Sequence, residues 1–558
     1  MDGLHTWWAG FGTEIGPEQL TPEPARALAS FLAEGYAAGA RPVSLRQNDE
    51  YGAVHFETNV ERPQDLANAI RGVEPIAIFF PLARGQPRVF ALRSDFPDVE
   101  HQNLTPSDVP RSLCIDDRPW AEARLTSTSF DLIRRTQLWL AKAARGELHD
   151  PSQPLEPLFF PTSAAMIIPP DVLTETGSSP AELIGFMRPD NNRISLAYRA
   201  EHIVPKARNL PGFVMLILQS RPQSTAARMR IAPRTLGELN QELKRGGIEI
   251  MPVIKERLKE WAGITADKLR RLDCRLAIVV DFPTRAASGR EAHDTRAFIC
   301  LTQSGELGVK LGVLAKNIDQ KGYSRLLSQG DDVAGMASEV EMAQVHQAFT
   351  RELAVAVAGG QPDRRKVVLV GAGAIGSQVA VDLAREGKFT WTVADQDYLL
   401  PHNFARHALF PADVAAPKAP ALAGQLSDLL QEQCRPIICD VLNPGESKQT
   451  LDAAFANADV ILDASASVAV SRHLSDIGAS ARKLCFFFNP AGTDAVLLVE
   501  DKARSITQRD LEAQYHGFIQ RDSGLKGHLA GAGDGLRYSG SCRTLTNRIP
   551  ATRAALLS

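Results

Sequence analysis

Residues 366–385 read KVVLVGAGAIGSQVAVDLAR, and this stretch decides the fold of the carboxy-terminal part of the chain. The unbroken apolar run Val367–Val370 is typical of a strand buried in a parallel sheet. Gly371, Gly373 and Gly376 follow it and open a helix. In such a motif the first glycine permits a tight turn, the second lets phosphate approach the backbone, and the third lets the helix pack on the strand. The pattern predicts a nucleotide-binding α/β fold with phosphate at the helix N-terminus.

The residues that follow bear on the kind of nucleotide. Most chains with this glycine pattern bind a nicotinamide or flavin dinucleotide, and the next predicted strand, Thr390–Ala394, delivers Asp395 close to the position that holds ribose hydroxyls. A dehydrogenase has no use for the clustered Asn403, Arg406 and Lys418. An adenylating enzyme does, because charge builds on the α-phosphate and the pyrophosphate leaving group needs cations and Mg²⁺.

The segment DQDYLLPHNFARHALF (395–410), followed by Lys418, resembles the D-x-D…N-x-x-R-Q…G-x-x-K signature of the ThiF/MoeB and ubiquitin-activating adenylation family. The resemblance implies that ATP is the cofactor and that Arg406 and Lys418 take part in catalysis. Asp395 would hold the ribose, Asn403 and Arg406 the phosphates, and Lys418 the transferring phosphate. The complete set expected to bind the nucleotide is Gly371, Gly373, Gly376, Asp395, Asp397, Asn403, Arg406 and Lys418.

One part of the family pattern is missing. The predicted strand 459–463 leads into L-D-A-S-A-S, where the family has L-D-C-T-D-N and its second Asp binds Mg²⁺. Ala466 stands at that position, and Asp463 is the carboxylate left at the strand end. The alternatives are that Asp463 or Asp397 helps to hold Mg²⁺, that ATP itself holds the metal, or that the domain is inactive. The retained phosphate-binding residues favour an active domain.

A second resemblance lies nearer the N-terminus. A predicted helix (24–39), predicted strands (53–60, 76–80 and 89–92) and a proline-rich loop precede Cys114. The order, and the pattern Leu113, Cys114…Trp120 before a predicted helix Ser129–Arg145, resemble a ubiquitin-conjugating domain. The resemblance implies that Cys114 accepts a thioester. The family's His-Pro-Asn tripeptide is missing, and His101, Gln102 and Asn103 stand in its neighbourhood. The alternative is a cysteine buried as a small hydrophobe.

The second candidate thiol is Cys542, in the glycine-rich stretch 524–558. Such a stretch cannot pack a core and is expected to be mobile. Cys542 precedes Arg543 and a predicted helix, Pro550–Leu557, and a thiol in this setting has a lowered pKa and is nucleophilic. Activating enzymes of the resembled family carry their thioester-forming cysteine on such a segment. The alternative is a structural thiol.

Composition limits the remaining possibilities. A chain of 558 residues, with 44% hydrophobic content and a net charge of -3, is expected to form roughly two to four globular domains. The charge predicts no nucleic-acid partner, and the lack of a bilayer-length apolar run or a signal peptide predicts a cytoplasmic protein without a membrane partner. The seven cysteines include no C-x-x-C pair, so no zinc site is evident.

We predict a multidomain α/β and α+β protein. The expected domains are a ubiquitin-conjugating-like α+β domain (1–150), a central α/β domain (151–335) and a Rossmann-like adenylation domain (336–558), which an amphipathic helix (339–357) introduces. As a whole, the chain resembles the bacterial fused ubiquitin-transfer enzymes of the anti-phage operons known as CBASS.

That resemblance implies a transferase with a relay of thioesters. ATP would adenylate the C-terminal carboxylate of a partner protein with a flexible tail, Cys542 would take the acyl group, and Cys114 would pass it to an amine on a target protein. In the resembled family the partner is a cGAS-like nucleotidyltransferase and the enzyme is a homodimer. Two rival functions stay open: ThiF-like activation of a sulfur carrier for biosynthesis, and a non-catalytic nucleotide-binding scaffold.

Overall fold

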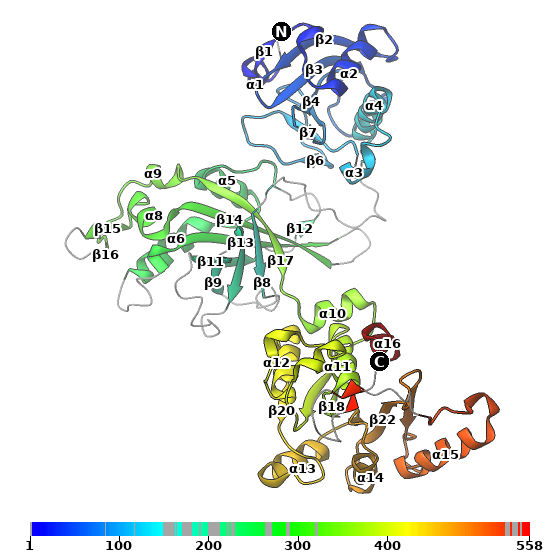
Figure 1. Cartoon of the computed structure of the whole chain (residues 1–558). Coiled ribbons are helices and arrows are strands. Elements are labelled where there is room, and N and C mark those ends of the chain that lie inside the picture. The colour runs from blue at the N-terminus through cyan, green and yellow to red at the C-terminus, as the bar shows by residue number, and fades with distance from the viewer. Residues whose placement is uncertain are drawn as a thin grey trace. The chain divides into compact units, whose positions relative to one another are not determined.

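The computed structural model describes most of the chain, and Figure 1 shows its elements along the sequence. The described residues are 3–83, 85–116, 118–148, 162, 164–169, 181–188, 191–198, 212–219, 223–224, 229–262, 271–285, 291–317, 322–530, 536–537, 545–546 and 549–558. The chain divides into two compact units, Met1–Ala348 and Phe349–Ser558. The predicted boundaries near residues 150 and 335 stay predictions. None of the helices in the described ranges is long and apolar enough to cross a membrane.

The first unit begins with an antiparallel sheet of order β1-β2-β3-β4-β5-β7-β6. Its strands are β1 (Thr13–Glu14), β2 (Ala40–Gln47), β3 (Tyr51–Asn59), β4 (Val73–Pro81), β5 (Arg88–Ala91), β6 (Gln102–Asn103) and β7 (Arg111–Leu113). Three of them match the predicted strands, and β2 was not predicted. The helices are α1 (Thr6–Gly10), α2 (Glu23–Ala33), α3 (Trp120–Ala123) and α4 (Ser129–Arg145), and α4 confirms the predicted helix after Cys114.

Both faces of this sheet are covered. Alternate residues of a strand point to opposite faces, so Ile76 and Ile78 of β4 pack with α2 and α4, whereas Phe79 faces the other way. On that second face Phe79 packs with Trp8 and Phe11, which α1 and the residue after it supply. The N-terminal helix thus closes a face that would otherwise expose aromatic side chains.

The second part of this unit is a sheet that closes on itself. The strands follow the order β11-β9-β10-β8-β17-β14-β13-β12, and β13 also pairs with β11, which completes a barrel. They are β8 (Ala165–Ile168), β9 (Ala181–Arg188), β10 (Asn191–Tyr198), β11 (Gly212–Gln219), β12 (Gln223–Ser224), β13 (Arg275–Arg285), β14 (Glu291–Gln303) and β17 (Val340–Gln347). The same part of the unit contains helices and a hairpin (Figure 1). The helices are α5 (Leu236–Arg245), α6 (Ile250–Trp261), α8 (Ser304–Lys310) and α9 (Val333–Met336), and the hairpin consists of β15 (Leu314–Asn317) and β16 (Gly322–Arg325).

Alternation again decides how the barrel packs. Met215 and Ile217 of β11 belong to one core with residues of β8, β13, β14 and β17, whereas Leu216 and Leu218 belong to the core shared with α5, α6 and α8. Small side chains such as Ala277 and Ala297 contribute to the first core, which fits the limited room inside a closed barrel.

The helix predicted for residues 339–357 is wrong over its first half. Val340–Gln347 forms β17, which pairs antiparallel with β14 and parallel with β8, and only α10 (Arg351–Ala358) is helical. Val340 and Met342 pack in the core shared with the helices and Ala343 packs in the other core, so the two faces of the strand differ, and hydrogen bonding to two neighbouring strands selects this arrangement over the helical alternative.

The second unit is a doubly wound α/β domain. Its sheet has the order β20-β19-β18-β21-β22-β23, parallel except for the final pair. The strands are β18 (Asp363–Val370), β19 (Lys388–Ala394), β20 (Arg435–Ile437), β21 (Val460–Asp463), β22 (Arg482–Phe488) and β23 (Ala495–Val499). The helices are α11 (Ala374–Arg385), α12 (Lys418–Leu430), α13 (Lys448–Ala456), α14 (Val468–Asp476), α15 (Gln508–Arg521) and α16 (Ala551–Leu557), and the pair β24 (Leu536–Arg537) and β25 (Leu545–Thr546) lies near the end.

The winding of this sheet fixes the position of its crevice. Helices α11 and α12 pack on one face and α13 and α14 on the other, so the central strands are buried on both faces (Figure 1). After β18 the chain moves outward through β19 and β20, then returns to the opposite side of β18 for β21. The strand order therefore reverses between β18 and β21, and ligands of such sheets bind at the carboxyl ends of the strands at that point.

Candidate nucleotide and thiol sites

The glycine turn after β18 lies at this reversal point. Gly371 has a φ of 95°, and a Cβ added there would lie 2.7 Å from the Cα of Ser465. A Cβ on Gly376 would lie 2.0 Å from the carbonyl oxygen of Gly371. A Cβ on Gly373 would meet no atom within 4 Å. The turn, the open approach and the close helix packing are the environments predicted for the three glycines.

Helix α11 begins at this turn without a side-chain cap. Its N-cap residue is Gly373, and its first turn holds no acidic residue. The N–H groups of a first helical turn have no partners within the helix, and the helix dipole makes this end attractive to anions. The open space beside Gly373 therefore gives a phosphate group access to unpaired backbone donors.

Asp395 connects the end of β19 to the glycine turn. Its Oδ2 accepts a hydrogen bond from the N–H of Ala372 (2.6 Å), and its Oδ1 accepts one from the N–H of Asp397 (2.7 Å). Burial raises the pKa of Asp395, while these two backbone donors and the charge of Lys418 oppose the rise. A carboxylate has lone pairs for further bonds, so Asp395 can still accept hydrogen bonds from ribose hydroxyls.

Lys418 supplies a buried positive charge on the same side of the crevice. It is the first residue of α12, and its side chain is only 9% exposed. Its Nζ lies 2.9 Å from Oδ2 of Asp397, whose side chain is 65% exposed, and its backbone N–H donates to the carbonyl of Asp397 (2.8 Å). The pair holds the ammonium group in place, and a phosphate could compete with Asp397 for it.

Asn403 and Arg406 lie in a short 3₁₀ turn, Pro401–Ala405, and at its end. The Oδ1 of Asn403 accepts a hydrogen bond from the N–H of Leu400 (2.8 Å). The carbonyl of Arg406 accepts one from Nε2 of Gln378 on α11 (3.2 Å), and burial lowers the pKa of the Arg406 guanidinium. The turn is therefore attached to α11, the helix whose N-terminus is predicted to bind phosphate.

A residue that the sequence analysis missed completes this attachment. His407 is buried; its Nε2 donates to the carbonyl of Ala372 (2.7 Å), and its Nδ1 accepts from the N–H of Leu409 (3.1 Å). Burial lowers the pKa of His407, and the hydrogen bond that Nδ1 accepts requires the neutral ring. The signal was present in the sequence, because His407 stands where the N-x-x-R-Q signature has Gln.

The opposite wall of the crevice, at the end of β21, contains the buried side chains of Asp463 and Cys485. Asp463 at the end of β21 is 3% exposed, and its Oδ1 accepts from the backbone N–H (2.9 Å) and the hydroxyl (2.6 Å) of Ser465. Its Oδ2 accepts from the thiol of Cys485 at 3.6 Å. Burial raises the pKa of Asp463, and burial with the neighbouring Asp463 raises the pKa of Cys485 to about 12.

These residues do not fit a magnesium site as they are placed. Asp463 is buried with both oxygens engaged, and Ala466, with a φ of 56°, offers no ligand. Within the described ranges, no three His, Cys, Asp or Glu side chains lie close enough together to hold a metal ion. The predicted role of Asp463 as a Mg²⁺ ligand stays a prediction that would require its side chain to rearrange.

Cys114 directly follows β7 in the first unit and is partly exposed. Its backbone N–H donates to the carbonyl of His101 (3.0 Å), and the thiol lines a cavity of about 740 Å³. Asn103 lines the same cavity and donates to Oγ of Ser112 (3.0 Å). This surface position contrasts with Cys300, whose pKa complete burial raises to about 12.

Charged groups beside Cys114 are arranged around Asp116. Its carboxylate pairs with Arg118 (2.8 Å) and Arg135 (3.3 Å), and the hydrogen bond from Arg118 is the main reason that its pKa is lowered. Both guanidinium groups line the cavity that contains Cys114. The other predicted nucleophile, Cys542, lies outside the described residues.

Two family models match the chain. Residues 48–176 match the Prokaryotic E2 family A, and residues 353–515 match the ThiF family. The first match contains Cys114, and the second contains the glycine turn, Asp395 and Lys418.

The chain is also similar to one curated protein and to several solved structures. The ATP-dependent ubiquitin transferase-like protein Cap2 of Enterobacter hormaechei subsp. hoffmannii (strain UCI 50) is 31% identical over 121 residues, which is 22% of this chain and 20% of that protein. A crystal structure of E. coli MccB with AMPCPP and MccA is 15% identical, covers 37% of this chain and 55% of that chain, and has a TM-score of 0.25. A crystal structure of PaaA is 18% identical over 23% of this chain and 39% of that chain, with a TM-score of 0.20.

The chain thus spans about a fifth of the length of its curated relative. The two family matches occur in the order that the sequence analysis predicted, with the conjugating-like domain first and the adenylation-type domain second. One polypeptide therefore carries a region that matches a prokaryotic E2 family and a region that matches the ThiF family.

Proposed function

We propose that this chain uses ATP to activate the C-terminal carboxylate of a partner protein and transfers the resulting acyl group to an amine. The observation that carries the proposal is the uncapped N-terminus of α11 beside the open side of Gly373, with the buried ammonium of Lys418 on the same wall of the crevice. Backbone donors and a fixed cation suit the binding of phosphate groups and the stabilisation of charge at the α-phosphate.

Each predicted nucleotide-site residue has a role in this proposal. Asp395 accepts hydrogen bonds from the ribose, the α11 end with Asn403 and Arg406 binds phosphates, and Lys418 moves from Asp397 to the phosphoryl group that is attacked. The carboxylate of the partner attacks the α-phosphorus, the α–β phosphoanhydride bond breaks, and pyrophosphate leaves with the electron pair. Mg²⁺ would be held by the phosphates of ATP, since no group of three His, Cys, Asp or Glu side chains among the described residues could hold it.

The acyl group then moves through two thiols. Cys542 attacks the acyl adenylate and releases AMP, and Cys114 takes the acyl group from Cys542 by thioester exchange. An amine, in the simplest case a lysine of the target, attacks the Cys114 thioester and releases the thiol. The partly exposed position of Cys114 next to Arg118 and Arg135 supports its role.

The identity of the partners follows from the resemblance alone. We propose a cGAS-like nucleotidyltransferase, or another protein with a flexible C-terminal tail, as the activated partner. The protein would act as a homodimer in the cytoplasm during anti-phage defence. The curated relative bears the name of an ATP-dependent ubiquitin transferase-like protein, which supports the type of reaction.

Isotope exchange between ATP and pyrophosphate tests the first step. With a tail-bearing partner present, we expect exchange in the wild-type protein and a fall of roughly 10²–10³-fold in Lys418→Ala, because a preorganised charge at the reacting phosphate is lost. Lys448→Ala is the matched control, since Lys448 pairs with Asp452 on the surface at 2.9 Å and should not matter. Absence of exchange in the wild-type protein would favour the non-catalytic scaffold.

Non-reducing gels test the relay. We expect Cys542→Ala to form no thioester with the partner, and Cys114→Ala to form one that is not passed to the target. A Cys114→Ala protein that still modifies its target at the full rate would contradict conjugation through this residue. If the partner is adenylated but never becomes thioester-linked to Cys114, activation of a sulfur carrier becomes the better interpretation.

A further inference from the structure

Two distant parts of the second unit contact one turn of its sheet, residues 489–494 between β22 and β23. The Nδ2 of Asn489 donates a hydrogen bond to the carbonyl of His528 (3.3 Å). A methyl group added at Gly492 would collide with the side chain of Ile549, so the backbone of the turn and that side chain are in close contact. The segment between His528 and Ile549 therefore begins and ends at the same turn.

This turn lies on the edge of the sheet that also holds the glycine turn. β18, β21 and β22 are parallel neighbours, and residue 489 directly follows β22, so the turn is at their carboxyl ends. Neighbouring strands lie about 4.8 Å apart, which places the ends of β22 and β18 roughly 10 Å apart. A chain spans at most about 3.5 Å per residue, so Cys542 stays within about 25 Å of Ile549. The thiol can therefore reach the crevice from this turn.

His528 is held by its side chain as well as by its backbone. Its Nε2 lies 3.0 Å from the hydroxyl of Tyr515 on α15, and its Nδ1 lies 3.4 Å from Oδ2 of Asp494 in the turn. A neutral ring with its proton on Nδ1 donates to Asp494 and accepts from Tyr515, so both contacts are satisfied together. Burial and the charge of Asp494 raise the pKa of Tyr515, which keeps its hydroxyl proton. The imidazole thus joins α15 to the turn.

The partners of His528 are themselves fixed to the sheet. The ring of Tyr515 packs edge-on against Phe487 of β22, with the ring centroids 5.7 Å apart. Asn489 is 2% exposed, and its Oδ1 accepts a hydrogen bond from the N–H of Asp494 (3.1 Å), which closes the turn. These contacts hold residue 528 in one place relative to the ends of the strands.

We propose that His528 is a positioning residue for the attack of Cys542 on the acyl adenylate. Its bonds fix the point at which the segment with the thiol leaves the sheet edge, and so limit the directions from which the sulfur approaches the crevice. In this step the sulfur attacks the acyl carbon, the bond from that carbon to the phosphate oxygen breaks, AMP leaves with the electron pair, and the thiol proton passes to water. The inference rests on the proposed role of Cys542.

A nucleoside electrophile tests this step without a partner protein. The probe is adenosine with a 5′-vinylsulfonamide group: a thiolate adds to its β-carbon, a carbon–sulfur bond forms, and the α-carbon takes up a proton. The protein is the full chain with Cys114→Ala, and the same chain with Cys542→Ala added gives the background. Mass spectrometry of the labelled peptide gives the rate at Cys542 for each probe concentration, with ATP as competitor. Iodoacetamide, which has no nucleoside, reports the general reactivity of the same thiol.

We expect His528→Ala to lower the maximal rate of labelling about tenfold, while the half-saturating probe concentration stays within about twofold of the parent value. Tyr515→Phe keeps the ring and loses one hydroxyl, and it should lower the rate about threefold. His528→Gln should recover most of the rate, because its amide donates and accepts as the neutral imidazole does. The iodoacetamide rate and the melting temperature should stay the same in all three variants.

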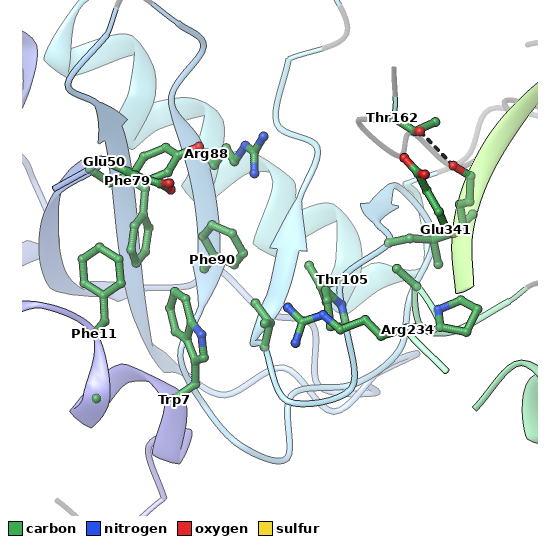
Figure 2. Close-up of a pocket in the computed structure, with 18 of the residues that line it drawn as sticks. Trp7, Phe11, Glu50, Phe79, Arg88, Phe90, Thr105, Thr162, Arg234 and Glu341 are labelled. Carbon is green, nitrogen blue, oxygen red and sulfur yellow. Dashed lines mark hydrogen bonds between the residues drawn. The ribbon is translucent and has the colours of Figure 1, made fainter. Parts of the chain in front are cut away.

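Two further variants serve as controls. His516→Ala removes an exposed histidine of α15 whose ring also contacts that of Tyr515, at 5.3 Å between centroids. Arg234→Ala removes an exposed side chain of the other compact unit, where Arg234 lines a cavity of about 1000 Å³ (Figure 2). Neither variant should change the rate at which the probe labels Cys542.

A His528→Ala protein that is labelled as fast as the parent chain would overturn the positioning role. A slower reaction that comes from weaker probe binding, or that is matched by an equal fall with iodoacetamide, would overturn it as well. In each of these cases the proposed role of Cys542 stands. If the probe labels no cysteine of the parent chain in competition with ATP, the role of Cys542 fails, and the inference fails with it.

Discussion

The two walls of the crevice between β18 and β21 are built in different ways. On the β18 wall the backbone makes the site, through the turn at Gly371, the uncapped start of α11 and the carbonyl of Ala372 that His407 holds. On the β21 wall side chains face inward, and Asp463 is bonded to Ser465 and Cys485. The β18 wall has the glycine turn and the uncapped helix end predicted to bind phosphate, whereas the wall predicted to hold a metal ion has Ala466 where a carboxylate was expected. This difference predicts that the protein binds phosphate strongly and Mg²⁺ weakly.

The largest expected effect separates two glycines of the β18 wall. In Gly376→Ala the new methyl group would lie 2.0 Å from the carbonyl oxygen of Gly371, so the turn must open. We expect a loss of ATP affinity of more than 100-fold together with a lower melting temperature, measured by calorimetry.

Gly373→Ala is the matched variant, because its methyl group meets no atom within 4 Å. We expect an unchanged melting temperature but a loss of ATP affinity of roughly tenfold, since the methyl group occupies space that phosphate needs. If both variants lose stability equally, or if Gly373→Ala binds ATP normally, the β18 wall does not bind phosphate as inferred here.

A smaller effect is expected when a carboxylate is introduced at position 466 of the β21 wall. Ala466 has a φ of 56°, a left-handed conformation that Asp and Asn adopt more readily than Ala. Ala466→Asp should therefore stabilise the fold by about 0.5 kcal/mol and lower the Mg²⁺ concentration needed for half-maximal ATP–pyrophosphate exchange about fivefold.

Ala466→Asn is the control for this change, because it has the same backbone preference without the charge. It should gain the stability but not the altered Mg²⁺ dependence. If the Asp and Asn variants have the same Mg²⁺ requirement, the missing carboxylate is not what distinguishes the two walls.

The glycine turn of the β18 wall was predictable from the sequence, because a turn of this kind needs glycine at fixed positions. Gly371, Gly373 and Gly376 occupy the environments predicted for them, and the strand predicted at 367–370 is the end of β18. The start of α4 at Ser129 was also predictable, since Thr128 and Asp131 form a capping box there.

Features that depend on distant partners were not predictable in the same way. β17 is a strand because β8 and β14 pair with it, although the local pattern of 340–347 was compatible with a helix. The hydrogen bond between Cys485 and Asp463 joins residues on neighbouring strands, and the spacing of the two residues in the sequence does not predict it.

The smallest expected effect concerns His407, which joins the predicted phosphate-binding turn to the β18 wall. Burial lowers its pKa in the folded protein below the ordinary value of about 6.5; the hydrogen bond to Ala372 and the charge of Asp413 oppose this effect, and the charge of Lys418 adds to it. The unfolded chain therefore takes up the proton more readily, so the stability that the neutral ring provides is present above pH 6.5 and lost as the pH falls through the lowered folded value.

Protonation also removes the acceptor for the N–H of Leu409, which should loosen the turn that carries Arg406. We expect ATP affinity to fall about threefold more between pH 7 and pH 5 in the wild type than in His407→Gln, because a Gln side chain can donate to Ala372 and accept from Leu409 without titrating. His407→Phe should bind weakly at every pH. Parallel pH curves for the wild type and the Gln variant would show that this histidine only fills space, and the attachment between the two parts of the wall would then need another explanation.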